Sequence, residues 1–243
     1  MHPRHLPRTD GPDGLLLVDK PSGMTSHDVV DRIRWRFRFP KVGHGGTLDP
    51  MATGLLVLLI GRGTKISSQV MSTDKTYEGA MHFGITTNTE DVDGKVLLER
   101  DAGGVTREAL EAAMGRRLGD QMQTPPMVSA IKKEGVPLYK LARKGQTVER
   151  EPRLIHVYEF RLLGFAPPQA QFRLRCTKGT YVRTLCADIG EELGCGAFLE
   201  SLRRTEAGPF NVAAAHPLDA LLELPVQELI PRLIPLSAVP LRP

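Results

Sequence analysis

The chain has 243 residues, 41% of them hydrophobic, so it can bury a core without disulfide or metal staples. Its formal net charge of +4 permits a polyanionic partner without requiring one. Three cysteines, Cys176, Cys186 and Cys195, include no CxxC pair, which argues against a disulfide framework and favours a reducing, cytoplasmic location. The N-terminus lacks an apolar signal core and the longest aliphatic run is residues 55–60, which argues against secretion and membrane insertion.

The N-terminal segment, residues 1–14, is polar and proline-containing and shows no periodicity, so we expect a flexible tail. Residues 15–18 are apolar and predict a short buried strand. Residues 20–23, with the sequence KPSG, predict a turn.

A helix is predicted to begin after Thr25, because Thr25 and Asp28 fit a capping box. Val29, Ile33 and Phe37 recur every four residues on one helical face. Residues 32–39 also alternate basic and apolar residues, which is strand periodicity, but the cap favours the helix. Five cations lie here without an acid among them: Arg32, Arg34, Arg36, Arg38 and Lys41. They form either a solvated face or a phosphate-contacting patch, and their place before the loop described next favours the patch.

The most distinctive stretch is GHGGTLDPMATG, residues 43–54. Its glycines allow close approach of a ligand, and Pro50 pushes Asp49 away from helical angles, so Asp49 is expected on a fixed loop. The stretch lacks the Lys-Ser/Thr ending of a P-loop and the spacing of a dinucleotide fingerprint. Asp before Pro is also ordinary turn chemistry. The working part is therefore expected to be the carboxylate, and its catalytic role depends on the blocks that accompany it.

The middle of the chain alternates predicted strands, loops and helices. Residues 55–60 and 75–83 predict strands, the first buried on both faces. Residues 84–94 predict a loop. The cluster EDVDG at residues 90–94 within it superficially resembles a calcium loop but lacks the twelve-residue ligand spacing, so we assign no metal. Residues 106–114 predict a capped helix that ends at Gly115.

A second basic stretch covers residues 131–153, with seven basic residues against three acidic ones. A short helix is predicted over residues 138–144, ending at Gly145, in an inserted flap. Its cations are either solvated or grip RNA. The stretch contains Lys132, Lys133, Lys140, Arg143, Lys144, Arg150 and Arg153.

The C-terminal part predicts two antiparallel strands, a helix, a further strand and one or two short helices. They lie at residues 154–163, 169–177, 180–193, 199–207 and 216–234. Antiparallel runs of strands with helices between them indicate the α+β class.

Six blocks resemble, in order, those of the bacterial tRNA pseudouridine-55 synthase family. They are KPSGMTS (20–26), GHGGTLDPMATG (43–54), KTY (75–77), PMVSA (126–130), KGTYVRTL (178–185) and LRRT (202–205). The resemblance implies a pseudouridine synthase fold with a bent, mixed, largely antiparallel central sheet flanked by helices. It implies one catalytic domain over residues 15–234, with an inserted RNA-gripping thumb at about residues 124–153.

The resemblance implies an isomerase that converts uridine-55 in the T loop of tRNA to pseudouridine, without a cofactor and with base flipping. Asp49 would act at the ribose, either as nucleophile at C1′ or as the base that removes the 2′ proton. Arg183 would pair with Asp49 and keep its carboxylate ionised. The partner would be the T stem-loop of tRNA, and we expect a monomer without an obligatory protein partner.

The resemblance also implies substrate-binding roles for residues outside the Asp49 loop. Tyr77 would stack on the uracil, and Tyr181 and Leu202 would line its pocket. His44 would occupy the space that the flipped base vacates. Lys20 and Lys65 could meet phosphates near the pocket mouth, or either could be a plain surface lysine.

The sequence departs from the family in two places. Family members usually continue into a C-terminal RNA-binding domain of the PUA type, whereas a proline-rich tail and no such domain are expected at residues 235–243. Gly45 stands where threonine is common, and we expect little effect.

Two other functions are compatible with parts of the sequence. A non-catalytic RNA-binding module would keep the fold, although the complete set of Asp49, Tyr77 and Arg183 argues against it. A glycoside hydrolase also uses carboxylates at a sugar carbon but needs two of them, and none of the recognised blocks supplies a second acid.

Overall fold

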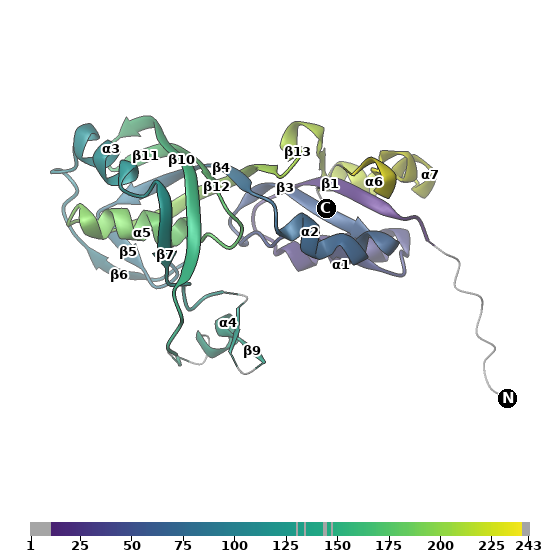
Figure 1. Ribbon diagram of the computed structural model, residues 1–243, viewed down its shortest axis with the longest axis horizontal. Helices are drawn as coiled ribbons and strands as arrows, with labels where there is room; N and C mark the ends of the chain where they lie inside the picture. The colour runs from purple at the N-terminus through teal and green to yellow at the C-terminus, as the bar shows by residue number, and fades with distance from the viewer. Residues whose placement is uncertain (1–10, 130, 134, 143–144, 147, 240–243) are drawn as a thin grey trace. The chain divides into compact units, whose positions relative to one another are not determined.

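The structure is a computed structural model that describes residues 11–129, 131–133, 135–142, 145–146 and 148–239 (Figure 1). Most of the expected N-terminal tail and residues 240–243 of the expected C-terminal tail lie outside these residues. The chain divides into two compact units. The first unit comprises Met1–Ser72 and Glu206–Pro243, and the second comprises Thr73–Thr205.

The sheet of the first unit is built on the pairing of β1 with β3. Its strands are β1 (Gly14–Lys20), β2 (Val42–His44), β3 (Thr53–Ile60) and β14 (His216–Pro217). β1 runs antiparallel to β3 with Leu17 opposite Val57, β2 is antiparallel to β3, and β14 is parallel to β1. Leu55 to Ile60 are all buried, as a continuous aliphatic run predicts for a central strand. The strands predicted at residues 15–18 and 55–60 are confirmed.

The helices of the first unit are short except for α1. They are α1 (Ser26–Phe37), η1 (Gly61–Ile66), α2 (Ser67–Met71), η2 (Val212–Ala214), α6 (Leu218–Glu223), α7 (Val226–Leu229), η3 (Ile230–Arg232) and η4 (Leu236–Ala238). α1 begins with the predicted capping box of Thr25 and Asp28 and ends at Arg38, which has a φ of 54°. Val29, Ile33 and Phe37 are buried on one face of α1. The segment is therefore a helix, and the strand that the alternation at residues 32–39 also indicated does not form.

The sheet of the second unit has the strand order β12-β4-β11-β10-β7, and all five strands are labelled in Figure 1. Its strands are β4 (Lys75–Phe83), β7 (Gly119–Gln123), β10 (Arg153–Ala166), β11 (Gln169–Cys176) and β12 (Ala197–Ala207). β4, β11, β10 and β7 pair antiparallel in that order. β12 ends in the first unit, where β13 (Phe210–Asn211) pairs with its last two residues. The α+β class and the mixed, largely antiparallel strand pairing are confirmed.

Two helices, α3 (Arg107–Gly115) and α5 (Val182–Glu192), pack together in the second unit (Figure 1). The loop predicted at residues 84–94 is partly wrong. Its beginning forms β5 (Ile85–Thr87), which pairs with β6 (Val96–Glu99) in a separate two-stranded sheet. Strand β5 is too short to show a period of its own, so only the partner strand reveals it.

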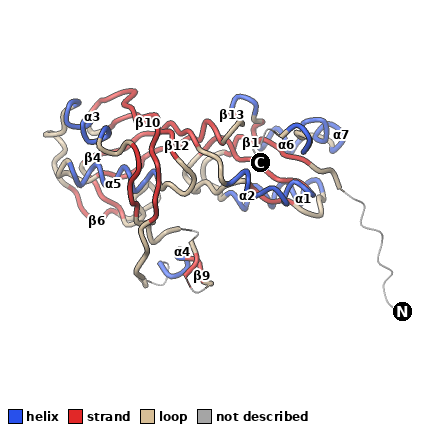
Figure 2. The backbone as a smooth tube through the Cα atoms, viewed as in Figure 1, coloured by secondary structure: helices blue, strands red, loops and turns tan. Residues whose placement is uncertain are grey.

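A small insertion leaves the sheet after β7 and returns at β10 (Figure 2). It contains β8 (Lys132–Lys133), β9 (Val136–Pro137) and α4 (Leu138–Ala142). Leu138 is buried, and its backbone N–H donates to the Ile131 carbonyl. The side chains of Lys132, Lys133, Lys140, Arg143 and Lys144 lie outside the described residues.

The three cysteines are buried thiols without a disulfide. Burial raises the pKa of Cys176 to about 12 and raises that of Cys186 as well, which makes these thiols poor nucleophiles. In the described part of the chain, no helix is long and apolar enough to cross a membrane.

Candidate functional site

The Asp49 loop joins β2 to β3 in the first unit. It is hydrogen-bonded by the side chain of Lys20, the last residue of β1. The Lys20 side chain is fully buried (0% exposed). Its ammonium donates to the carbonyl oxygens of Pro21 at 2.9 Å, Pro50 at 3.2 Å and Ala52 at 2.6 Å. The prediction that Lys20 meets phosphates is therefore wrong, because its three donors point at backbone carbonyls inside the protein. Lys20 instead fixes the backbone directly after Asp49.

The backbone before Asp49 is fixed by the N-terminus of α1. The Ser26 hydroxyl accepts from the Leu48 N–H at 2.8 Å and lies 3.2 Å from the Leu48 carbonyl. On the far side, the Gly23 N–H donates to the Pro50 carbonyl at 2.9 Å. The KPSGMTS block thus clamps the loop on both sides, and the Asp49 side chain is left half-buried.

His44 and Gly45 form the entry to the same loop. His44 is half-buried at the end of β2, and its Nδ1 accepts from the Gly46 N–H at 3.4 Å. A Cβ added to Gly45 would lie 2.3 Å from Cγ1 of the buried Val70. Any residue with a Cβ at position 45 would therefore clash with Val70 unless Val70 moved.

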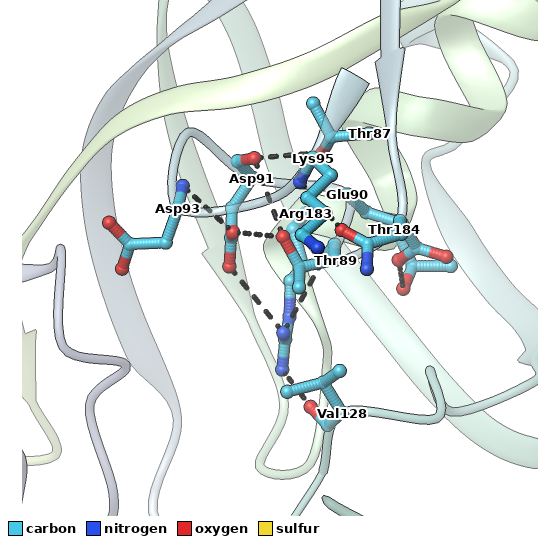
Figure 3. Close-up of polar contacts among 10 residues, drawn as sticks. Thr87, Thr89, Glu90, Asp91, Asp93, Lys95, Val128, Arg183 and Thr184 are labelled. Carbon is cyan, nitrogen blue, oxygen red and sulfur yellow. Dashed lines mark hydrogen bonds and ion pairs between the residues drawn. The ribbon is translucent and has the colours of Figure 1, made fainter. Parts of the chain in front are cut away.

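Arg183 lies in the first turn of α5 in the second unit and is 3% exposed. Its guanidinium forms an ion pair with Asp91 at 3.5 Å and donates to the carbonyls of Val128 at 2.6 Å and Thr89 at 3.4 Å (Figure 3). It also lies over the Tyr181 ring, 5.6 Å from the centroid. Partners from several segments leave the guanidinium little freedom to move.

The Asp91 carboxylate is itself held by its own loop (Figure 3). One of its oxygens accepts from the Thr89 hydroxyl at 2.5 Å and from the Asp93 N–H at 3.2 Å. The Thr87 hydroxyl donates to the Asp91 carbonyl at 2.8 Å. The loop whose acidic cluster resembles a calcium site thus binds the guanidinium of Arg183. Among the described residues, no group of three or more His, Cys, Asp or Glu is placed to hold a metal ion.

Sequence reasoning missed the role of Asp91, and the only available signal was an acidic run in a threonine-rich loop. The neighbouring Glu90 makes a second contact between this loop and α5. Its carboxylate accepts from the Thr184 hydroxyl at 2.6 Å, and its backbone has a φ of 65°. Burial raises the pKa of Glu90 above its usual value. Glu90 and Asp91 therefore bind successive residues of the first turn of α5.

The remaining predicted site residues lie in or beside the sheet of the second unit. Tyr77 is buried in β4 at 9% exposed. The Tyr181 backbone is clamped by the Gln123 amide, which accepts from its N–H at 2.8 Å and donates to its carbonyl at 3.0 Å. Leu202 on β12 is also buried and lies over β4, since a Cβ added to Gly79 would come within 3.2 Å of its Cδ1.

The two units divide the predicted site residues between them. His44 and Asp49 belong to the first unit, whereas Tyr77, Tyr181, Arg183 and Leu202 belong to the second. Within the second unit, the structure brings Tyr181 and Arg183 into direct contact.

Comparison with known proteins gives two family matches that together cover most of the chain. The model for the N-terminal domain of TruB family pseudouridylate synthases matches residues 34–182. The model for the tRNA pseudouridylate synthase B C-terminal domain matches residues 183–236.

Individual relatives and solved structures agree with these matches. The chain is 56% identical over 223 residues to tRNA pseudouridine synthase B of Opitutus terrae, covering 92% of each protein. It is 51% identical to the protein of the same name from Pseudomonas aeruginosa, over 86% of this chain and 68% of that one. A chain in the crystal structure of a Cbf5-Nop10-Gar1 complex is 30% identical with a TM-score of 0.69, over 86% of this chain and 54% of that one. This chain therefore spans about half the length of that protein.

A chain in the structure of an H/ACA RNP bound to a substrate RNA containing 2′-deoxyuridine is similar at 27% identity, with a TM-score of 0.65. The match covers 86% of this chain and 52% of that one. The likeness in fold thus extends along most of the present chain. On the strength of the family matches and of the close relatives, the chain belongs to the TruB family of pseudouridylate synthases, which are isomerases.

Proposed function

We propose that the protein isomerises uridine-55 in the T loop of tRNA to pseudouridine, with Asp49 as the catalytic carboxylate. The observation that carries this proposal is the clamped Asp49 loop. Lys20 and Ser26 fix the backbone on both sides of Asp49, while its carboxylate remains half-buried. The tRNA substrate is supported by the relatives that are named tRNA pseudouridine synthase B.

The reaction rearranges one nucleotide and needs no second reactant. The bond from uracil N1 to ribose C1′ breaks, the uracil turns, and a bond from C5 to C1′ forms. C5 then loses its proton and N1 gains one, so atoms and electrons balance. Asp49 acts at the ribose, either as nucleophile at C1′ or as the base for the 2′ proton. The nucleotide must first leave the base stack, at a cost of a few kcal/mol.

The other site residues have supporting roles in this proposal. Arg183 pairs with Asp49, and this role is supported by a guanidinium already fixed by Asp91. Tyr77 stacks on the uracil, and Tyr181 and Leu202 line its pocket.

His44 fills the space left by the flipped base, for which the flat imidazole ring is suited. The insertion within residues 124–153 contacts the T stem-loop, as its position between β7 and β10 and its basic composition favour. The protein acts as a cytoplasmic monomer, and residues 15–234 form its catalytic domain.

The proposal is tested by Asp49→Asn on an unmodified tRNA transcript, with pseudouridine measured by mass spectrometry of the digested RNA. We expect Asp49→Asn to abolish product and to bind RNA nearly as well as the wild-type protein. Asp101→Asn is the matched control, because Asp101 is exposed and outside the proposed site. A transcript with cytidine at position 55 should yield no product. Wild-type turnover by Asp49→Asn would refute the mechanism, and product from the cytidine-55 transcript would refute the position.

A further inference from the structure

The exposed face of α1 carries an aromatic side chain that the proposed reaction does not use. Trp35 is 74% exposed and is the only tryptophan in the chain. It is also the only exposed large hydrophobic residue on α1. The Arg34 guanidinium lies over its ring, 5.5 Å from the centroid. An indole in water beside a guanidinium is a surface that can stack on a flat partner.

The cations of this segment divide into two groups. Arg34 forms an ion pair with Asp31 at 2.8 Å, and Arg36 donates to the carbonyls of Leu222 at 2.6 Å and Leu224 at 3.0 Å at the end of α6. Arg34 and Arg36, two of the five cations in the predicted phosphate-contacting patch, thus already have partners within the protein. The exposed cations that remain are Arg32, Arg38 and Lys41.

The acids of the same face are engaged within the helix. Asp31 is bound by Arg34. The Asp28 carboxylate accepts from the Thr25 N–H at 2.8 Å and from its hydroxyl at 2.7 Å in the capping box. The face around Trp35 thus combines an exposed indole with a local excess of positive charge on a helix that Arg36 ties to α6.

We propose that Trp35 and its neighbours Arg32 and Arg38 form an auxiliary RNA contact, in which the indole stacks on an unpaired base. The guanidinium groups bind the adjacent phosphates. The bound nucleotide differs from the target uridine, which belongs at Asp49. The identity of the partner as RNA rests on the proposed function.

The chemistry of this face favours RNA over a second protein. Bases of every kind offer a π-face to an aromatic side chain, and their phosphates match the cations. A stable protein interface buries about 800 Å² on each partner around an apolar centre. On α1, Trp35 is flanked in sequence by arginines on both sides, and α1 exposes no second large hydrophobic residue that would extend such a centre.

Trp35 reports on its own contact, because it is the only tryptophan. Its fluorescence is measured in Asp49→Asn protein, in which we expect no turnover. The protein is titrated with whole tRNA transcript, with oligouridylate, and with a blunt RNA duplex lacking unpaired nucleotides. We expect tRNA and oligouridylate to quench the emission and to protect it from acrylamide. The duplex should bind through its phosphates with little quenching.

Substitution then measures how much the contact contributes. Trp35→Ala should weaken tRNA binding by roughly 5-fold to 150-fold, as expected for loss of one stacked base. Trp35→Phe should retain most of the affinity. In otherwise wild-type protein, Trp35→Ala should raise KM and leave kcat unchanged. Replacing Arg32 or Arg38 with glutamine should reduce the slope of log affinity against log salt by about 0.7 for each lost phosphate contact.

Ile230→Ala is the matched control, because Ile230 is an exposed hydrophobic residue of the same unit, and it should bind tRNA like the parent protein. Unchanged emission on saturation with tRNA, or parental affinity of Trp35→Ala, would overturn the contact. Sedimentation showing a dimer that Trp35→Ala dissociates would overturn it in favour of a second copy. Quenching by tRNA without pseudouridine formation by the wild-type protein would contradict the proposed function and still support the contact.

Discussion

The ion pair between Arg183 and Asp91 makes a prediction about the stability of the second unit. Asp91→Asn removes the negative charge but keeps the size of the side chain. The two side chains are 3% and 6% exposed, and their charged atoms lie 3.5 Å apart. Removing one partner of a buried pair costs about 3–5 kcal/mol. The lower end applies here, about 3 kcal/mol, because the asparagine oxygen can still accept from the loop donors and Arg183 keeps its backbone carbonyls.

Urea unfolding measures this change. With an m-value of about 2 kcal/mol/M, a loss of about 3 kcal/mol lowers the midpoint by about 1.5 M. The control is Asp93→Asn, the same chemical change two residues away on an exposed side chain. It should stay within about 0.5 kcal/mol of the wild-type protein. If Asp91→Asn and Asp93→Asn unfold at the same urea concentration, the ion pair does not stabilise the fold and the reasoning fails.

Three further predictions concern buried groups. Lys20→Met should lower the free energy of unfolding by about 3 kcal/mol, because three backbone carbonyls lose a charged donor. Thermal or urea unfolding measures this change. Lys65→Met, on the surface, should have no effect. Gly45→Ala should cost about 1–3 kcal/mol and be partly rescued by Val70→Ala, and equal costs in both backgrounds would refute the predicted clash. Burial lowers the pKa of Lys75 from 10.5 to about 8, so the native state binds fewer protons than the unfolded chain between these two pH values. The free energy of unfolding should therefore rise from pH 8 to pH 10.5. In Lys75→Met this rise should be absent.

Elements that depend on neighbours along the chain could be predicted from the sequence. The capping box at Thr25 fixed the start of α1, and the aliphatic run at residues 55–60 identified a buried strand. Strands β4 and β12 and helix α3 also lie close to their predicted positions. Caps, periods and aliphatic runs are local properties, so they can be read without knowing what the element packs against. The family motifs likewise pointed to Asp49 and Arg183 as candidate site residues.

The tertiary structure alone decided what the polar side chains of the motifs contact. Lys20 reads as a phosphate ligand until its ammonium is found among carbonyls 30 and 32 residues away along the chain. Asp91 reads as part of a metal loop until Arg183 is found beside it, and Arg36 reads as a free cation until it meets the end of α6. The partner of a charged group is set by long-range packing, and burial then forces that partner to satisfy it. Residue type and spacing carry no record of such pairings.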